Sequence, residues 1–256
     1  MEQQANLKYE AIKVNQDEVV KIADEILVEA PLQININQKS FTVVMRTPGA
    51  DLELSLGLLV NEGVLKKDVE YRIHQENENI LDIEIREEDL GLGYLNARSL
   101  LSVSSCGICG KQSLEDLHIE GYKNSKKQIV PKPKSFENLF IQLREHQTLF
   151  EKTGGSHAAA LFDENQKLCY IFEDIGRHNA VDKICGAMYL KKTKKKPTYL
   201  VVSGRVSYEI VSKAFFSKIP VILSVSACSS MAIDMAKELG ITLIGFNRGK
   251  QATFYS

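Results

Sequence analysis

The amino-acid sequence predicts an α/β protein with a smaller N-terminal α+β domain and a C-terminal domain that carries helices on a mixed, largely parallel sheet. Short runs of alternating apolar and polar residues occupy the first half, whereas strand-like and helix-like segments alternate in the second half. A lysine-rich stretch with Pro131 and Pro133 separates the halves and is the best linker candidate. We therefore expect two domains, 1–133 and 134–256.

The N-terminal domain is expected to hold a β-hairpin, a helix and a further strand. Alternating segments on either side of a turn predict the hairpin, and apolar residues on one helical face predict the helix, which Gly63 would end. In chain order, the hairpin strands are 32–36 and 41–45, the helix covers 52–60, and the last strand is 80–85.

The C-terminal domain is expected to alternate strands and helices. Strands separated by helices of this length favour a largely parallel sheet with helices packed on it. The expected order is a helix across 136–150, hairpin strands 158–162 and 168–172, a helix from about 177 to 190, a strand 199–202, a helix from about 206 to 216, a strand 221–225, a helix from about 229 to 239, and a strand 242–246.

Charge and hydropathy exclude several classes of protein. The 32 basic and 33 acidic residues give a net charge of −1, so the sequence predicts no nucleic acid and no anionic membrane as a partner. The N-terminal residues lack the features of a signal peptide, and no apolar stretch approaches the roughly 20 residues that span a bilayer. We therefore expect a cytoplasmic protein, in which five cysteines serve catalysis, metal binding or core packing rather than disulfides.

Two cysteines, Cys106 and Cys109, lie two residues apart between an apolar run and a polar segment. Gly107 and Gly110 allow the backbone to turn tightly around both sulfurs, and Lys111 is the nearby cation. A neighbouring thiol or cation lowers the pKa of a cysteine and increases the fraction of nucleophilic thiolate. The spacing suits a disulfide, a metal site or two thiols that work on one sulfur atom.

Three strand-to-helix turns in the second half carry small, polar or basic residues: 174–179, 203–207 and 226–230. In a parallel sheet such turns gather at the carboxyl edge, where ligands bind. Each turn opens a helix whose free N–H groups attract anions, and Arg177 and Arg205 add charge suited to phosphate. The sequence therefore predicts a phosphate-bearing ligand, although it has no Walker A or G-x-G-x-x-G motif.

Two further motifs and three further cysteines leave alternatives open. The segment 153–157 reads either as a binding loop or as a tight turn capped by its histidine, and 246–251 either adds basic residues to the same edge or forms a solvated tail. Cys169 and Cys185 are expected in the core, whereas Cys228 begins a helix at the proposed site and is ambiguous.

Five motifs occur together in this order: SCGICGK at 105–111, TGGSHAA at 153–159, EDIGRHNAVDK at 173–183, SGRVS at 203–207 and GFNRGK at 245–250. The set resembles the formate dehydrogenase accessory sulfurtransferase family, FdhD, from about residue 20 to the C-terminus. The combination is highly specific for that family.

The resemblance implies a sulfur relay. A cysteine desulfurase would load a persulfide onto Cys106, with Cys109 assisting, and the sulfur would pass to the molybdenum cofactor in its bis-guanine-dinucleotide form before the cofactor enters formate dehydrogenase. A homodimer is also expected. By the resemblance, the cofactor-binding residues are Phe246, Asn247, Arg248, Gly249, Lys250 and Gln251, to which the turns add Gly176, Arg177, His178, Ser203, Gly204, Arg205 and Ser229.

The resemblance also implies that the second half is similar in fold to cytidine deaminases, which hold zinc with histidine and cysteine at the starts of two helices. His178 occupies the first of these helix starts, but 203–207 contains no cysteine. We therefore expect neither a catalytic zinc nor any other metal ligand, and no deaminase activity.

Three other classes of protein stay open. The chain could be a chaperone that delivers cofactor without transferring sulfur, or a thiol–disulfide oxidoreductase, although no thioredoxin-like pattern surrounds the cysteine pair. A structural zinc would need four thiolates, hence two such pairs across a dimer. The order of sulfur handover between Cys106 and Cys109, the dehydrogenase served, and contacts of His157 or Cys228 with the cofactor also stay open.

Overall fold

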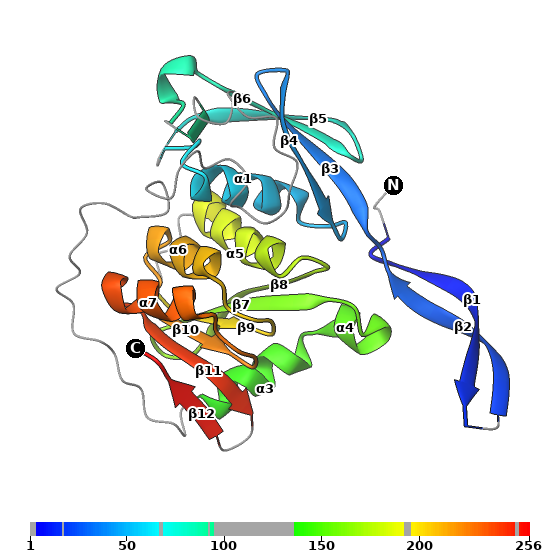
Figure 1. Cartoon of the computed structure of the whole chain (residues 1–256). Helices are drawn as coiled ribbons and strands as arrows, with labels where there is room; N and C mark the ends of the chain where they lie inside the picture. The colour runs from blue at the N-terminus through cyan, green and yellow to red at the C-terminus, as the bar shows by residue number, and fades with distance from the viewer. Residues whose placement is uncertain are drawn as a thin grey trace.

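The structure is a computed structural model, and it describes residues 4–16, 18–66, 69–91, 93–94, 136–191, 196–248 and 251–256. Two sheets lie at opposite ends of the molecule with helices between them, and a long two-stranded hairpin projects from the side (Figure 1). Cys106, Cys109 and the expected linker lie outside the described residues. The division into domains 1–133 and 134–256 therefore stays a prediction.

The smaller sheet comes from the first half of the chain. Its elements are β3 (Ala30–Ile36), β4 (Lys39–Arg46), α1 (Asp51–Asn61), β5 (Tyr71–Asn77), β6 (Ile80–Ile85) and the short 3₁₀ helix η1 (Glu87–Asp89). The strand order is β4-β3-β6-β5, with β3 and β6 parallel and the outer pairs antiparallel. The expected hairpin is confirmed, because Asn37 and Gln38 turn the chain with φ of 51° and 64°. The helix and the strand at 80–85 are confirmed as well.

The larger sheet has six strands in the order β12-β11-β10-β9-β7-β8. Its strands β9, β10 and β11 are parallel, whereas β7 runs antiparallel to β8 and β9, and β12 runs antiparallel to β11. The elements are β7 (His157–Asp163), β8 (Leu168–Asp174), α5 (Arg177–Lys191), β9 (Pro197–Val202), α6 (Tyr208–Phe216), β10 (Val221–Ser224), α7 (Ser230–Leu239), β11 (Thr242–Arg248) and β12 (Gln251–Phe254). This mixed α/β architecture confirms the expected fold class.

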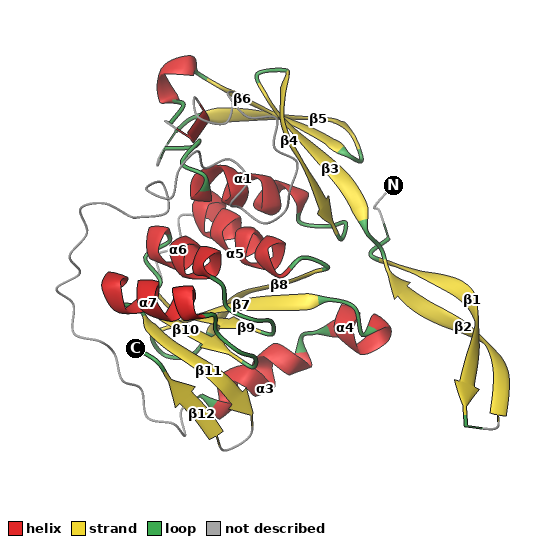
Figure 2. Ribbon diagram, viewed as in Figure 1, coloured by secondary structure: helices red, strands yellow, loops and turns green. Residues whose placement is uncertain are grey.

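Both faces of the six-stranded sheet are covered, because its strands are apolar on both sides. Helices α5, α6 and α7 cover the face that presents Leu200 and Val202, whereas α3 (Glu137–Glu145) covers the face with Tyr199 and Val201 (Figure 2). Both faces are buried along the central strands β7, β9 and β10, whereas the outer strand β8 is half-buried. The sheet is therefore a rigid platform for the loops at its edges.

One expected helix is wrong. The stretch 136–150 is not continuous, because α3 ends at Glu145 and a second helix, α4 (Thr148–Thr153), follows. The carboxylate of Glu173 accepts hydrogen bonds from the N–H groups of Leu149 and Phe150, each at 2.8 Å. These N–H groups lie in the first turn of α4, where no intrahelical partner exists. The contact with Glu173 therefore stabilises the start of a second helix. The apolar residues of 136–150 follow one helical period and do not indicate this break.

Helix α6 begins two residues later than expected. Val206 is extended and forms a parallel bridge with Cys228 instead of a helical turn. Its N–H donates to the carbonyl of Ala227, and its own carbonyl accepts from the N–H of Ser229, each at 3.0 Å. This small ladder ties the turn after β9 to the turn after β10.

Two antiparallel elements were not expected from the sequence. Strands β1 (Asn6–Asn15) and β2 (Glu18–Leu27) form the projecting hairpin, and β12 returns alongside β11 at the C-terminus (Figure 1). Neither pair carries the Asn-Gly or Asp-Gly turn that is the strongest sequence signal of a hairpin.

The two sheets are joined by direct packing of α1 against α5. A Cβ atom at Gly57 would overlap the carbonyl oxygen of Asp182, and one at Gly186 would overlap that of Glu53. Glycine on both helices therefore allows their backbones to touch. As α5 also packs on the six-stranded sheet, this contact fixes the N-terminal elements relative to the edge of that sheet.

Candidate functional site

The three strand-to-helix turns lie at one edge of the six-stranded sheet, as the sequence predicts. Strands β8, β9 and β10 run in the same direction, because β7 is antiparallel to both β8 and β9, and β9 is parallel to β10. The start of β7 lies at this edge too, with His157 paired to Asp174 at the end of β8. The residues at the end of β11 complete the row, because β11 is parallel to β10.

His157, Arg177 and Gly204 meet at the centre of this edge. A Cβ atom at Gly204 would lie 3.1 Å from Nδ1 of His157 and 3.4 Å from Cβ of Arg177, so a larger residue would press against the imidazole. Burial lowers the pKa of His157, and the charges of Arg177 and Arg205 lower it further. The imidazole is therefore neutral at pH 7, and the fixed positive charge comes from the two arginines.

The two arginines differ in their surroundings. Arg205 is exposed, whereas Nε of Arg177 is buried and has no hydrogen-bond partner among the described residues. A buried guanidinium N–H without a partner is costly unless a ligand accepts from it. The edge thus contains a donor that suits an anionic ligand.

His178 does not face the same way as Arg177 but turns toward the start of α6. Its Nε2 lies 2.9 Å from Oγ of Ser207, and its Nδ1 lies 3.1 Å from Oε2 of Glu209. The start of α5 and the start of α6 are therefore linked through one imidazole. The sequence predicts His178 at this edge but gives no signal for Glu209, because a glutamate in the first turn of a helix is common.

The predicted serines and the ambiguous cysteine mainly support the backbone. Oγ of Ser203 accepts from the N–H of Ala158 at 2.8 Å. Ser229 caps α7, with Oγ accepting from the N–H of Ala232 at 3.2 Å. Burial raises the pKa of Cys228 to about 11, so its thiol stays protonated at neutral pH. These residues shape the edge, and direct ligand contacts of their side chains stay predictions.

The segment 246–251 is not a tail, because it connects β11 to β12. Phe246 adopts a φ of 51°, its side chain is exposed, and its N–H donates to the carbonyl of Ser226 at 3.0 Å. The backbones of Asn247, Arg248 and Gln251 belong to these strands, whereas Gly249 and Lys250 lie outside the described residues. The segment thus begins beside the turn after β10, in agreement with the expected edge position.

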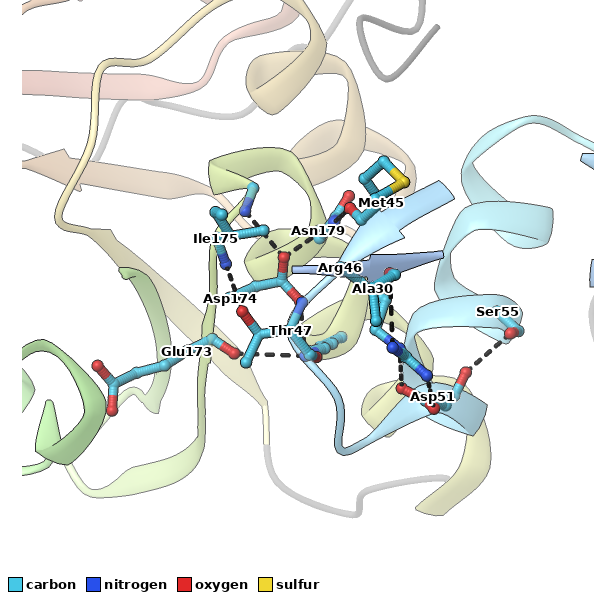
Figure 3. A network of polar contacts seen from close by, with 12 residues as sticks. Ala30, Met45, Arg46, Thr47, Asp51, Ser55, Glu173, Asp174, Ile175 and Asn179 are labelled. Carbon is cyan, nitrogen blue, oxygen red and sulfur yellow. Dashed lines mark hydrogen bonds and ion pairs between the residues drawn. The ribbon is translucent and has the colours of Figure 1, made fainter. Parts of the chain in front are cut away.

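A buried polar network anchors the first turn (Figure 3). The carboxylate of Asp174, fully buried, forms an ion pair of 2.7 Å with Nζ of Lys183 and accepts from the N–H of Gly176 at 2.8 Å and from Nδ2 of Asn179 at 2.9 Å. Lys183 also donates to the carbonyl of Thr47, which follows β4. The turn that carries Arg177 is therefore held in place by the N-terminal elements. No sequence motif indicates this role of Thr47 and Lys183.

Fold and site together define a mixed α/β protein whose basic turns converge at one sheet edge. A family model described as the FdhD/NarQ family matches residues 27–256, and the chain belongs to this family. The expected family is thereby confirmed.

Relatives from distant organisms match nearly the whole chain. The sulfur carrier protein FdhD of Saccharolobus solfataricus is 40% identical over 255 residues, which cover 97% of this chain and 95% of the relative. That of Streptomyces coelicolor is 37% identical over 262 residues, which cover 96% and 92%. Both relatives are thus named as sulfur carrier proteins.

A solved structure shares the fold. The crystal structure of a protein from Desulfotalea psychrophila, described as a formate dehydrogenase accessory protein, superposes with a TM-score of 0.78 and 20% identity, and covers 99% of this chain and 97% of the other. Similarity to cytidine deaminases stays a prediction. Within the residues that the structure describes, no helix is long and apolar enough to cross a membrane.

Proposed function

We propose that this protein is a sulfur carrier that accepts a persulfide sulfur from a cysteine desulfurase and transfers it to the molybdenum cofactor, in its bis-guanine-dinucleotide form, before the cofactor enters formate dehydrogenase. The observation that carries the cofactor part is the convergence of Arg177, Arg205 and Gly204 at one edge. We assign this relay to the cytoplasm, where thiols stay reduced. The homodimer stays a prediction.

The sheet edge suits the phosphates of such a cofactor. Helix α5, of 15 residues, and α6, of 9 residues, both begin there and present the positive end of the helix dipole to this edge. The buried Nε of Arg177 offers a donor, and Arg205 offers an exposed guanidinium. A guanine dinucleotide carries pyrophosphate groups that require several such donors, so the convergence of three turns supports the proposal.

The sulfur-loading step is assigned to Cys106 by its sequence context and by the family resemblance. Its thiolate would attack the terminal sulfur of the desulfurase persulfide, form a new S–S bond and release the desulfurase thiolate, so no oxidant is needed. Two of the described cysteines are poor alternatives, because burial raises the pKa of Cys185 and raises that of Cys228 to about 11. A thiol that stays protonated is a weak nucleophile.

Mass spectrometry of the intact protein tests the carrier role. After incubation with a cysteine desulfurase and cysteine, the reduced protein should gain the mass of one sulfur, and Cys106→Ala should not. Cys185→Ala is the control and should gain sulfur like the wild type. A gain that persists in Cys106→Ala and maps to Cys228 would assign the carrier thiol elsewhere.

A cofactor chaperone that transfers no sulfur would use the same sheet edge. The two functions differ in what Cys106→Ala does to formate dehydrogenase maturation in cells. A pure chaperone variant would still yield active formate dehydrogenase, whereas a sulfur carrier without its thiol would not.

A further inference from the structure

Ser207, His178 and Glu209 form a chain of polar contacts at the sheet edge. The imidazole of His178 lies between the hydroxyl of Ser207, at 2.9 Å, and the carboxyl of Glu209, at 3.1 Å. Only 12% of the His178 side chain and 10% of the Glu209 side chain are exposed. Burial strengthens these hydrogen bonds, and it raises the free-energy cost of a proton arrangement that leaves one of the groups unpaired.

The hydroxyl of Ser207 contacts His178 instead of capping helix α6. Ser207 is the N-cap residue of α6, where a serine side chain normally accepts from a backbone N–H of the first turn, but it makes no such cap hydrogen bond. The hydroxyl instead contacts the ring of His178, at the start of α5.

We propose that Ser207, His178 and Glu209 form an acid–base site that takes up a proton when a nucleoside diphosphate binds at the adjoining edge. The inference rests on the proposed nucleotide binding and adds a chemical role for these three residues. The proton comes from solvent and binds the carboxylate of Glu209, whose Oε2 lies 3.1 Å from Nδ1 of His178, so no covalent bond between heavy atoms changes. The negative charge of the diphosphate is the driving force, since a nearby anion favours protonation.

Charged groups from three elements face this site. Burial raises the pKa of Glu209 to about 7, and Glu62, after α1, and Asp182, on α5, act in the same direction. Lys213, on α6, and Arg177, on α5, oppose this rise. The carboxyl is thus poised to gain or lose a proton near neutral pH, which a surface glutamate is not.

The same three residue types also form the nucleophilic site of serine hydrolases. There, the carboxylate stays ionised and stabilises the imidazolium that forms when the serine attacks. A carboxyl with a pKa of about 7 is half neutral at pH 7 and cannot supply that fixed charge. The arrangement therefore suits proton exchange with a bound ligand rather than attack by Ser207.

Calorimetry with GDP tests the proposal. Titrations at pH 7 in buffers of different ionisation enthalpy report the protons exchanged on binding. For the wild type we expect net uptake of up to about half a proton per GDP, because Glu209 is already half protonated at pH 7, and Glu209→Gln should abolish this uptake. His74→Asn is the matched control, because His74 contacts Glu84 at 3.3 Å in an exposed pair far from the edge. It should leave the proton uptake unchanged.

Each other result has a distinct meaning. GDP binding with a heat that is independent of buffer, or proton uptake that persists in Glu209→Gln, would overturn this proposal and leave nucleotide binding intact. A complete lack of GDP binding would overturn both. The NMR titration of the His178 ring in the wild type, with and without GDP, needs no variant and should show a shifted midpoint with ligand. Stoichiometric labelling of Ser207 by a fluorophosphonate would identify a nucleophile instead.

Discussion

At the scale of single residues, the sheet edge combines two fixed charges with groups whose charge can change. Burial, together with the charges of Arg177 and Arg205, lowers the pKa of His157, so that this ring is neutral at pH 7. An anionic ligand would offset the arginines, and its phosphates would find a donor in the buried Nε of Arg177. The positive charge at this edge therefore favours an anionic ligand.

Replacing Arg205 should weaken nucleotide binding. A hydrogen bond to a charged group is worth about 1.5–3 kcal/mol, so we expect Arg205→Ala to lower the affinity for GDP by roughly tenfold to a hundredfold. Arg72→Ala is a matched control, because Arg72 is an exposed arginine on β5, in the other sheet. Calorimetry measures both. An affinity unchanged in Arg205→Ala would remove this residue from the site.

The stability of the protein should depend on the ionisation of Glu209. Its pKa is about 7 in the folded state and near 4.5 when unfolded, so the unfolded state binds fewer protons between these values. The contribution of Glu209 to the free energy of unfolding is therefore greatest below pH 4.5 and is lost as the pH rises through 7. In denaturant unfolding, the stability of the wild type relative to Glu209→Gln should fall by about 2–3 kcal/mol over this range. A constant difference would show that burial does not raise the pKa of Glu209.

At the scale of elements, close contacts decide where helices lie and where they stop. Glu173 starts α4 by binding the N–H groups of Leu149 and Phe150, and glycines let α1 and α5 touch. Neither contact produces a periodic signal, since it joins residues far apart in the chain. The contact of α1 with α5 nonetheless helps to position a loop of the site, because α5 begins at Arg177.

Gly186→Ala tests the contact between the helices. Alanine is the better helix former by about 1 kcal/mol, but its methyl group would overlap the backbone of Glu53. We expect the overlap to dominate and stability to fall by about 1–3 kcal/mol. At Gly155 a Cβ atom would lie 3.4 Å from Cβ of Leu27, so Gly155→Ala should cost little. Thermal unfolding compares the two, and equal stability would mean that the helices can move apart freely.

At the scale of the whole molecule, the two sheets are bound to each other through buried polar groups as well as apolar packing. Thr47 follows β4, and its N–H, carbonyl and hydroxyl all bond to residues around the turn after β8 (Figure 3). The ion pair of Asp174 and Lys183 lies at the centre of these bonds. Unfolding of one part would therefore expose unpaired groups of the other.

We expect the described parts to unfold in one cooperative transition, which Lys183→Met should shift. Leaving the Asp174 carboxylate buried without its cation costs about 3–5 kcal/mol, whereas the loss of an exposed ion pair costs less than about 1 kcal/mol. Arg86→Ala, which breaks the exposed pair with Asp89, is the control. The double variant Lys183→Met and Asp174→Asn should recover part of the loss. Two separate calorimetric transitions in the wild type would show that the sheets are independent.

The sequence alone determined the fold class, most strands and helices, and the family, because periodicity and short motifs are local properties of the chain. It also placed Arg177, Gly204 and Arg205 at one edge, since the direction of parallel strands follows from the order of strands and helices. Only the tertiary structure decided that 136–150 breaks into two helices and that His178 contacts Ser207 and Glu209. These features depend on pairs of residues that only the packed chain brings together, and no local pattern encodes such pairs.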